Sequence, residues 1–366
     1  MSQEEFSQET MFMLYCARVN IDTSTQCKLH ELIHLPLDWN HIIEQSSYHG
    51  ILPLLYYNIH KIQSQNIPES AFAILKNSYY DTLVKNMYLW REFCHIQDAF
   101  NKAGIKIIPL KGIILAETLY HNLGLRPMVD IDILVQEKDI LNAKNELLQL
   151  DYKIYLKDLP EDYWKRYHCH FQFRNLDKNI ILELHWTLAP PRPNRIDINE
   201  LWKRSRVQTA DYSEVLVLSH EDALLSLCLE ICKNISSLQC LKLKNLCDIH
   251  ELISQYGERL DWDYIDNKII SWRLKGCFFY LYLLTKTYLD TRWPTKIISG
   301  IKLRAIRTTV LNLSILDIQR KSRFQASLLM LAMLDRTADC LMLALQRIAM
   351  ISRKINFVIS TLRHDK

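Results

Sequence analysis

The sequence predicts an α+β fold in which a small mixed sheet with flanking helices lies between N-terminal and C-terminal helical regions. Three observations support this class. Residues 1–102 and 196–366 show mainly helical periodicity, whereas residues 103–195 contain short apolar runs of strand length. Three of the seven glycines lie between residues 104 and 124. An Asn/Asp-rich stretch at 175–179 separates two further runs and is typical of a hairpin turn.

The N-terminal region contains signals for several helices. Asp38 can cap a helix over residues 41–49, and Gly50 can end it. Pro68 precedes the longer segment Glu69–Lys102, whose apolar residues recur every three or four positions. We therefore expect a helical support for the segment that follows.

The segment that follows combines strands with acidic and basic residues. An apolar strand over 105–110 leads into a Lys111–Gly112 turn, a short helix and a loop carrying Arg126. Asp130 and Asp132 then open a second strand and point to the same face, because side chains alternate along a strand. Two carboxylates on one face favour a divalent cation, and Mg²⁺ (or Mn²⁺) binds carboxylates together with phosphate oxygens. The turn and Arg126 suit a phosphate; solvated aspartates at a strand edge are the alternative.

A predicted hairpin adds a third carboxylate. If it is symmetric about the turn, Gln172 faces Glu183, His170 faces His185, and Glu183 and His185 share a face. Glu183 could accept the proton of an attacking hydroxyl or hold a second metal ion; a salt-bridged surface glutamate is the alternative. The two histidines could contact phosphate or substrate, or form a hydrogen-bonded pair within the hairpin. A His–His–Glu metal site lacks a fourth ligand in the sequence.

Beyond a rigid Pro-rich connector at 190–193, the sequence returns to helices, including the apolar run Ala223–Cys232. Residues 291–366 contain 14 Lys and Arg against four Asp and Glu, which favours a polyanionic partner such as RNA; ordinary solvated helices are the alternative. The predicted regions are 1–102, 103–195, 196–295 and 296–366.

Composition is typical of a globular protein, with 49% apolar and 23% charged residues. No apolar run reaches the roughly 18 residues of a membrane span, and the acidic N-terminus lacks the pattern of a signal peptide. The ten cysteines show no C-x-x-C spacing, so we expect them to be reduced and the protein to be cytoplasmic. Walker A and Rossmann glycine fingerprints are absent from the sequence.

The order L-K-G … Y … R-P-M-x-D-I-D-x-L-V resembles the nucleotidyltransferase superfamily whose best-known member is DNA polymerase β. It is most similar to an uncharacterised bacterial branch in which Lys-Gly replaces the usual Gly-Ser. That branch continues with an E-L-H-W strand, which is present here as Glu183-Leu184-His185-Trp186. The order is also similar to the toxin nucleotidyltransferases of toxin–antitoxin systems. The resemblance covers about residues 30–265.

The resemblance implies a polymerase β-like core at 103–195 and a helical domain at 196–295 that closes over the nucleotide. It implies metal-dependent transfer of NMP from an NTP to a hydroxyl acceptor, with release of pyrophosphate. The serine missing from the turn normally helps to hold the triphosphate, so either Lys111 replaces it or the site is weakened. The implied catalytic and metal-binding residues are Asp130, Asp132 and Glu183, and the implied nucleotide-binding residues are Lys111, Gly112, Arg126 and Lys244.

Several alternatives stay open. The acceptor could be a tRNA end or other RNA, a protein or a small molecule, and Lys244 could equally be a solvated helix lysine. A protein with the same fold could be a catalytically silent nucleotide- or RNA-binding module. A purely helical interaction protein, in which the motif matches by chance, predicts no strands near 105–110 and 130–135.

Overall fold

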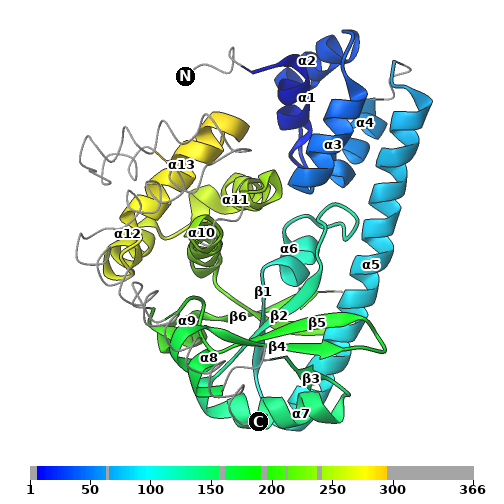
Figure 1. The fold of residues 1–366 in the computed structure, drawn as a ribbon. Helices are drawn as coiled ribbons and strands as arrows, with labels where there is room; N and C mark the ends of the chain where they lie inside the picture. The colour runs from blue at the N-terminus through cyan, green and yellow to red at the C-terminus, as the bar shows by residue number, and fades with distance from the viewer. Residues whose placement is uncertain are drawn as a thin grey trace, which may run out of the picture.

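The computed structural model describes residues 6–62, 66–155, 161–190, 196–210, 213–236 and 241–294, and the predicted basic region 296–366 lies outside them. Figure 1 shows a mixed α+β chain, as predicted. The helices are α1 (Gln8–Cys16), α2 (Thr23–Ile33), α3 (Trp39–His49), α4 (Leu52–Ile62), α5 (Glu69–Lys102), α6 (Gly112–Thr118), α7 (Ile140–Gln149), α8 (Glu161–Tyr167), α9 (Ile198–Arg204), α10 (His220–Ser236), α11 (Leu243–Tyr256), α12 (Trp262–Ser271) and α13 (Lys275–Leu289), with short 3₁₀ turns at Glu137–Asp139 and Gly257–Arg259. The strands are β1 (Ile107–Leu110), β2 (Asp130–Val135), β3 (Lys153–Ile154), β4 (His170–Asn175), β5 (Ile180–His185), β6 (Arg206–Ala210) and β7 (Ser213–Val217).

A five-stranded mixed sheet with the order β1-β2-β5-β4-β3 forms the centre of the fold. β2 runs antiparallel to β1 and parallel to β5, while β4 and β5 form the predicted hairpin. Ile131, Ile133 and Val135 are fully buried, which leaves the alternate positions of β2 for the opposite face. The strands at 107–110 and 130–135 contradict the purely helical interpretation of the sequence.

The N-terminal helices follow their sequence signals closely. The Asp38 side chain accepts a hydrogen bond from the His41 amide at the start of α3, and Gly50 ends that helix with φ 70°. α5 has the predicted bounds, Glu69–Lys102. In Figure 1 this helix runs from the N-terminal helices down to the sheet, where it contacts β2, α6 and α7. It therefore ties the N-terminal helices to the sheet.

The region after residue 196 differs from the prediction, which contained helices alone. β6 and β7 form a two-stranded hairpin, and β7 packs against β1 at the edge of the main sheet. The five-residue strands were missed because β6 alternates polar and apolar residues over too short a run to separate strand from loop. The hairpin covers an otherwise open sheet edge. α10, α11, α12 and α13 pack together beyond it, on the left of Figure 1.

Two further expectations concern composition. Among the described helices, none is both long and apolar enough to cross a membrane. The prediction that all cysteines are reduced is wrong for one pair, because Cys232 in α10 is bonded to Cys277 in α13. Helix periodicity cannot say which helices pack together, so this pairing could not be predicted from the sequence. The six remaining cysteines that the structure describes are free thiols.

Candidate active site

Three carboxylates gather on one face of the sheet. Asp132 in β2 stands directly opposite Glu183 in β5, and Gln172 and His170 of β4 stand opposite Glu183 and His185 as predicted. Only 6% of Asp132 is exposed. The structure thus brings the three acidic residues singled out in the sequence, including Asp130, into one cluster.

Asp130 has the least compensated charge of the three. Burial, followed by the negative charges of Asp132 and Glu183, raises the pKa of its carboxyl to about 6. Its carboxylate makes no hydrogen bond or ion pair with any residue that the structure describes. This carboxylate is therefore available to a ligand, and a cation would remove the repulsion.

Lys111 lies beside the carboxylates on a strained turn. Its backbone has φ 51° and ψ −120°, a conformation that glycine adopts more readily. Its ammonium lies 3.4 Å from Asp132 Oδ1 and 3.1 Å from Glu230 Oε2. Although burial alone lowers it, these carboxylates raise the pKa of Lys111, so the side chain is a fixed positive charge within a negative cluster.

The two hairpin histidines face the carboxylates rather than open solvent. His185 Nε2 lies 3.0 Å from Asp132 Oδ1 and 3.3 Å from Glu183 Oε2, and His170 Nε2 lies 3.5 Å from Glu183 Oε1. Burial and the hydrogen bond to Asp132 act in opposite directions on His185, and the hydrogen bond keeps its pKa well above the ordinary value. Burial, followed by the charge of His185, lowers the pKa of His170 to about 2.

Arg126 is held by a partner that the sequence did not reveal. Its Nε and Nη2 each donate a 2.7 Å hydrogen bond to one carboxylate oxygen of Asp248 in α11, and both side chains are buried. The Tyr120 hydroxyl donates a third hydrogen bond to Asp248, at 2.8 Å. Nη1 is the remaining edge of the guanidinium, and it faces Gly112, where an added Cβ would lie 2.8 Å from it. Arg126 thus lies at the predicted Lys111–Gly112 turn, and two of its three guanidinium nitrogens are already bound to Asp248.

Lys244 of α11 also lies near this turn, although its amine has a backbone partner. Nζ donates a 3.2 Å hydrogen bond to the Pro127 carbonyl, and the aliphatic stem packs on Gly50. Burial, followed by the charge of Arg126, lowers the pKa of the amine to about 8, while Asp130 opposes that change. Lys244 is therefore a partly buried cation close enough to Asp130 to affect it, not a solvated helix lysine.

Glu230 and Asp248 were not predicted as site residues. Glu230 carries the lone negative charge within the apolar run of α10, and an isolated charge in such a run is a usable signal. Asp248 lies four residues after Lys244 on α11 and thus on the same side of the helix. Each contact joins segments more than 100 residues apart, so neither pairing could be read from local periodicity.

The donor atoms suit a hard divalent cation beside an anion. Ligand atoms of Asp132, Glu183 and His185 lie within 4.8 Å of one another, and carboxylate oxygens are the preferred ligands of Mg²⁺. Lys111 adds a positive charge to the same cluster. The fold and this site define a mixed α+β protein with a potential metal centre on one face of a small sheet.

The family model of an uncharacterised nucleotidyltransferase family matches residues 36–290, which include the whole site. The chain belongs to this family and is a nucleotidyltransferase-type transferase, for which a nucleoside triphosphate is the implied substrate. Comparison with curated proteins and with solved structures found no match.

Proposed function

We propose that the protein transfers an NMP group from an NTP to a hydroxyl acceptor in a metal-dependent reaction that releases pyrophosphate. The observation that carries this proposal is the juxtaposition of Asp130, Asp132 and Glu183 beside Lys111 on one sheet face. Three carboxylates around a single ammonium leave a net negative cluster, and a divalent ion binds such a cluster strongly. The family match supports nucleotidyl transfer as the reaction.

In this proposal Asp130 and Asp132 hold Mg²⁺ or Mn²⁺, and Glu183 completes the set. A metal bound there supplies charge neutralisation for the phosphate oxygens and the leaving pyrophosphate. Glu183 also accepts the proton of the attacking hydroxyl, while His185 fixes the orientation of Asp132 through its hydrogen bond. Lys111 turns from Glu230 toward the phosphates, adding a positive charge where negative charge develops.

The role of Arg126 changes from the one implied by sequence. With Nε and Nη2 committed to Asp248, the guanidinium fixes the loop before β2 and offers only Nη1 to the turn. We therefore assign Arg126 to positioning the turn. Lys244 is the more available cation of the two, because the hydrogen bond of its amine goes to a neutral carbonyl.

We extend the proposal to kinship with the polymerase β-like superfamily, on the Asp-x-Asp strand beside the strand that carries Glu183. The acceptor we favour is RNA, because residues 291–366 are strongly basic in sequence. A silent nucleotide- or RNA-binding module is the alternative. The unpaired, partly buried carboxylate of Asp130 argues against it, because a cation bound beside the other two carboxylates would relieve the repulsion there.

The test incubates the full chain with Mg²⁺, each of four α-³²P-labelled NTPs, and total tRNA or cell lysate. Asp130→Asn removes one proposed ligand, and Asp177→Asn in the exposed hairpin turn serves as the matched control. Label on a discrete RNA or protein band with the wild type and the control, absent with Asp130→Asn, supports the proposal. Nucleotide binding without label transfer to any acceptor, including small molecules separated by chromatography, supports the silent module instead.

A further inference from the structure

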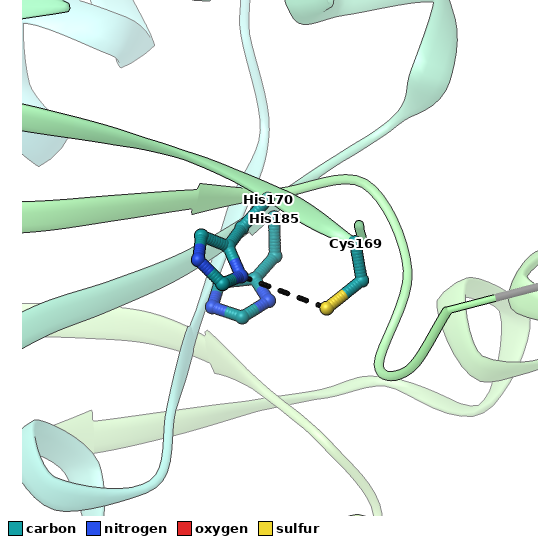
Figure 2. Close-up of side chains that lie close together, drawn as sticks. All are labelled: Cys169, His170 and His185. Atoms are coloured by element: carbon teal, nitrogen blue, oxygen red, sulfur yellow. Dashed lines mark hydrogen bonds between the residues drawn. The ribbon is translucent and has the colours of Figure 1, made fainter. Parts of the chain in front are cut away.

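A second cluster of side chains that can bind a metal adjoins the carboxylates and shares His185 with them. Cys169, His170 and His185 come together at one end of the β4–β5 hairpin, and their ligand atoms lie within 4.8 Å of one another. Figure 2 shows both imidazoles turned toward the cysteine sulfur, with His170 and His185 lying over each other. Cys169 is 2% exposed and His185 1%, and His170 is partly buried, so most of the cluster is shielded from solvent.

The nitrogens of the two rings divide between two environments. Nε2 of His185 and Nε2 of His170 both face the carboxylates Asp132 and Glu183. Nδ1 of His170 lies 3.6 Å from Cys169 Sγ. Nδ1 of the buried His185 makes no hydrogen bond of ordinary geometry with the described residues, although Cys169 lies near enough to help raise the pKa of this ring. A buried nitrogen of this kind is costly unless another atom binds it.

We propose that Cys169, His170 and His185 form a zinc site through Sγ and the two Nδ1 atoms. Thiolate and imidazole are the ligands that zinc prefers. Sulfur and nitrogen ligands at about 2.3 and about 2.1 Å from a tetrahedral zinc lie about 3.6 Å apart. That separation matches the one between Cys169 and His170. The fourth position is left to a water molecule.

The second shell of this site supports the same assignment. Histidines that ligate zinc typically donate their other ring N–H to a carboxylate, which fixes the tautomer and the ring orientation. His185 meets that condition with Asp132, at 3.0 Å, and Nε2 of His170 faces Glu183 at 3.5 Å. Zinc replaces the protons on Cys169 Sγ and His185 Nδ1 and releases them to solvent.

One imidazole ring therefore separates the zinc from each of two carboxylates proposed to be catalytic: His185 from Asp132, and His170 from Glu183. It fixes β4 against β5 and, through the rings, holds Asp132 and Glu183 in place. This positioning role rests on the proposed function, whereas the presence of the zinc does not. The two are tested by different measurements.

The first experiment measures metal bound to the full chain, purified, exposed to Zn²⁺ and dialysed, by mass spectrometry of the elements. We expect one zinc per chain in the wild type, in Cys27→Ser, whose thiol is exposed on α2, and in Asp130→Asn. We expect Cys169→Ser, which lacks the thiolate ligand, to lose most of its zinc in the dialysis. Full retention by Cys169→Ser overturns the site and points to zinc on the carboxylates instead.

The absorption spectrum of bound cobalt tests the site in the wild type, so the result does not depend on whether Cys169→Ser folds. Co²⁺ bound to the wild type should give a thiolate-to-metal charge-transfer absorption and the d–d bands of a tetrahedral ion. Both should persist in Cys27→Ser. A wild-type cobalt spectrum without the thiolate band overturns the proposal. Nucleotidyl transfer by the carboxylates, assayed separately with Mg²⁺, can fail without affecting this result, and the reverse also holds.

Discussion

Two buried ionic clusters, one around Lys111 and one around Arg126, differ in how their charges are balanced. Around Arg126, one guanidinium meets one carboxylate through two short hydrogen bonds, and the Tyr120 hydroxyl satisfies Asp248 further. Around Lys111, one ammonium faces Asp132 and Glu230, with further carboxylates at Asp130 and Glu183.

The difference separates a structural ion pair from a candidate binding site. A guanidinium already neutralised by a carboxylate has little left to offer a ligand, whereas an excess of carboxylates is unfavourable until a cation binds. Backbone strain follows the same division, because Lys111 has a positive φ and Arg126 does not. The sequence presented both residues as phosphate-binding cations, and only their partners tell them apart.

The largest expected effect comes from Asp130→Asn in the unbalanced cluster, which consists of Lys111 and the carboxylates around it. We expect transfer activity to fall on the order of 10³-fold, because a proposed metal ligand is lost. Above pH 6 the free energy of unfolding should not fall, since an ionised carboxylate beside two others is removed. Mg²⁺ should raise the melting temperature of the wild type more than that of the variant. A variant that loses stability but keeps its activity would mean that Asp130 has a structural role and is not a metal ligand of the active site.

The balanced cluster of Arg126, Asp248 and Tyr120 should respond in the opposite way, with a loss of stability. Asp248→Asn leaves the buried Arg126 without a counter-charge, and we expect the free energy of unfolding to fall by about 3–5 kcal/mol. Urea unfolding at pH 7 measures this. Asp290→Asn, in an exposed pair with Lys286, is the matched control and should change stability by less than about 1 kcal/mol. Equal effects of the two substitutions would refute the structural role of the Arg126–Asp248 pair.

The part of the site that is local in sequence could be predicted, and the part that joins distant segments could not. Alternation along β2 placed Asp130 and Asp132 on one face, and hairpin symmetry gave the pairing of His170 with His185. The partner of Arg126 lies 122 residues away, so no local pattern identifies it.

The same limit applies to the fold. Capping and periodicity gave α3 and α5, since both signals lie within the helices themselves. The β6–β7 hairpin is stabilised in part by its packing on β1. The periodicity of apolar residues within a segment cannot predict such a contact between distant segments. Glu230 reaches Lys111 for a comparable reason, because the packing of α10 decides which way the Glu230 side chain points.

Glu251, three residues after Asp248 on α11, extends the comparison to a buried carboxyl without an ion pair among the described residues. Burial raises its pKa to about 7, although the Val19 amide donates a 2.7 Å hydrogen bond to it. Because the folded pKa exceeds the ordinary 4.5, stability should fall as pH rises from 4.5 through 7, by roughly 3 kcal/mol in total.

Glu251→Gln keeps the shape and should remove this pH dependence. Unfolding in urea at pH 5 and pH 8 measures the difference between the variant and the wild type. We expect Glu251→Gln to gain stability over the wild type on going to pH 8. A difference that does not change with pH would mean that Glu251 titrates normally and that burial without a counter-charge has little cost here.

The smallest expected effect tests Gly112, where the two clusters touch. An alanine Cβ would lie 2.8 Å from Arg126 Nη1 and 3.1 Å from Met128 Cβ. The guanidinium cannot swing away while Asp248 holds its other two nitrogens. Gly112→Ala should therefore cost about 1–3 kcal/mol of unfolding free energy and also lower transfer activity, since the Lys111 turn must shift. Gly257→Ala, where the nearest atom lies at 3.4 Å, is the matched control.

A double-mutant cycle shows whether the Arg126–Asp248 pair is the cause of that cost. In the Asp248→Asn background the guanidinium is released and can yield to the new methyl group, so Gly112→Ala should cost less there than in the wild type. We expect a coupling energy of at least about 0.5 kcal/mol. Strict additivity would mean that Met128, rather than the fixed guanidinium, limits the space at Gly112, and the balanced cluster would then not shape the turn that carries Lys111.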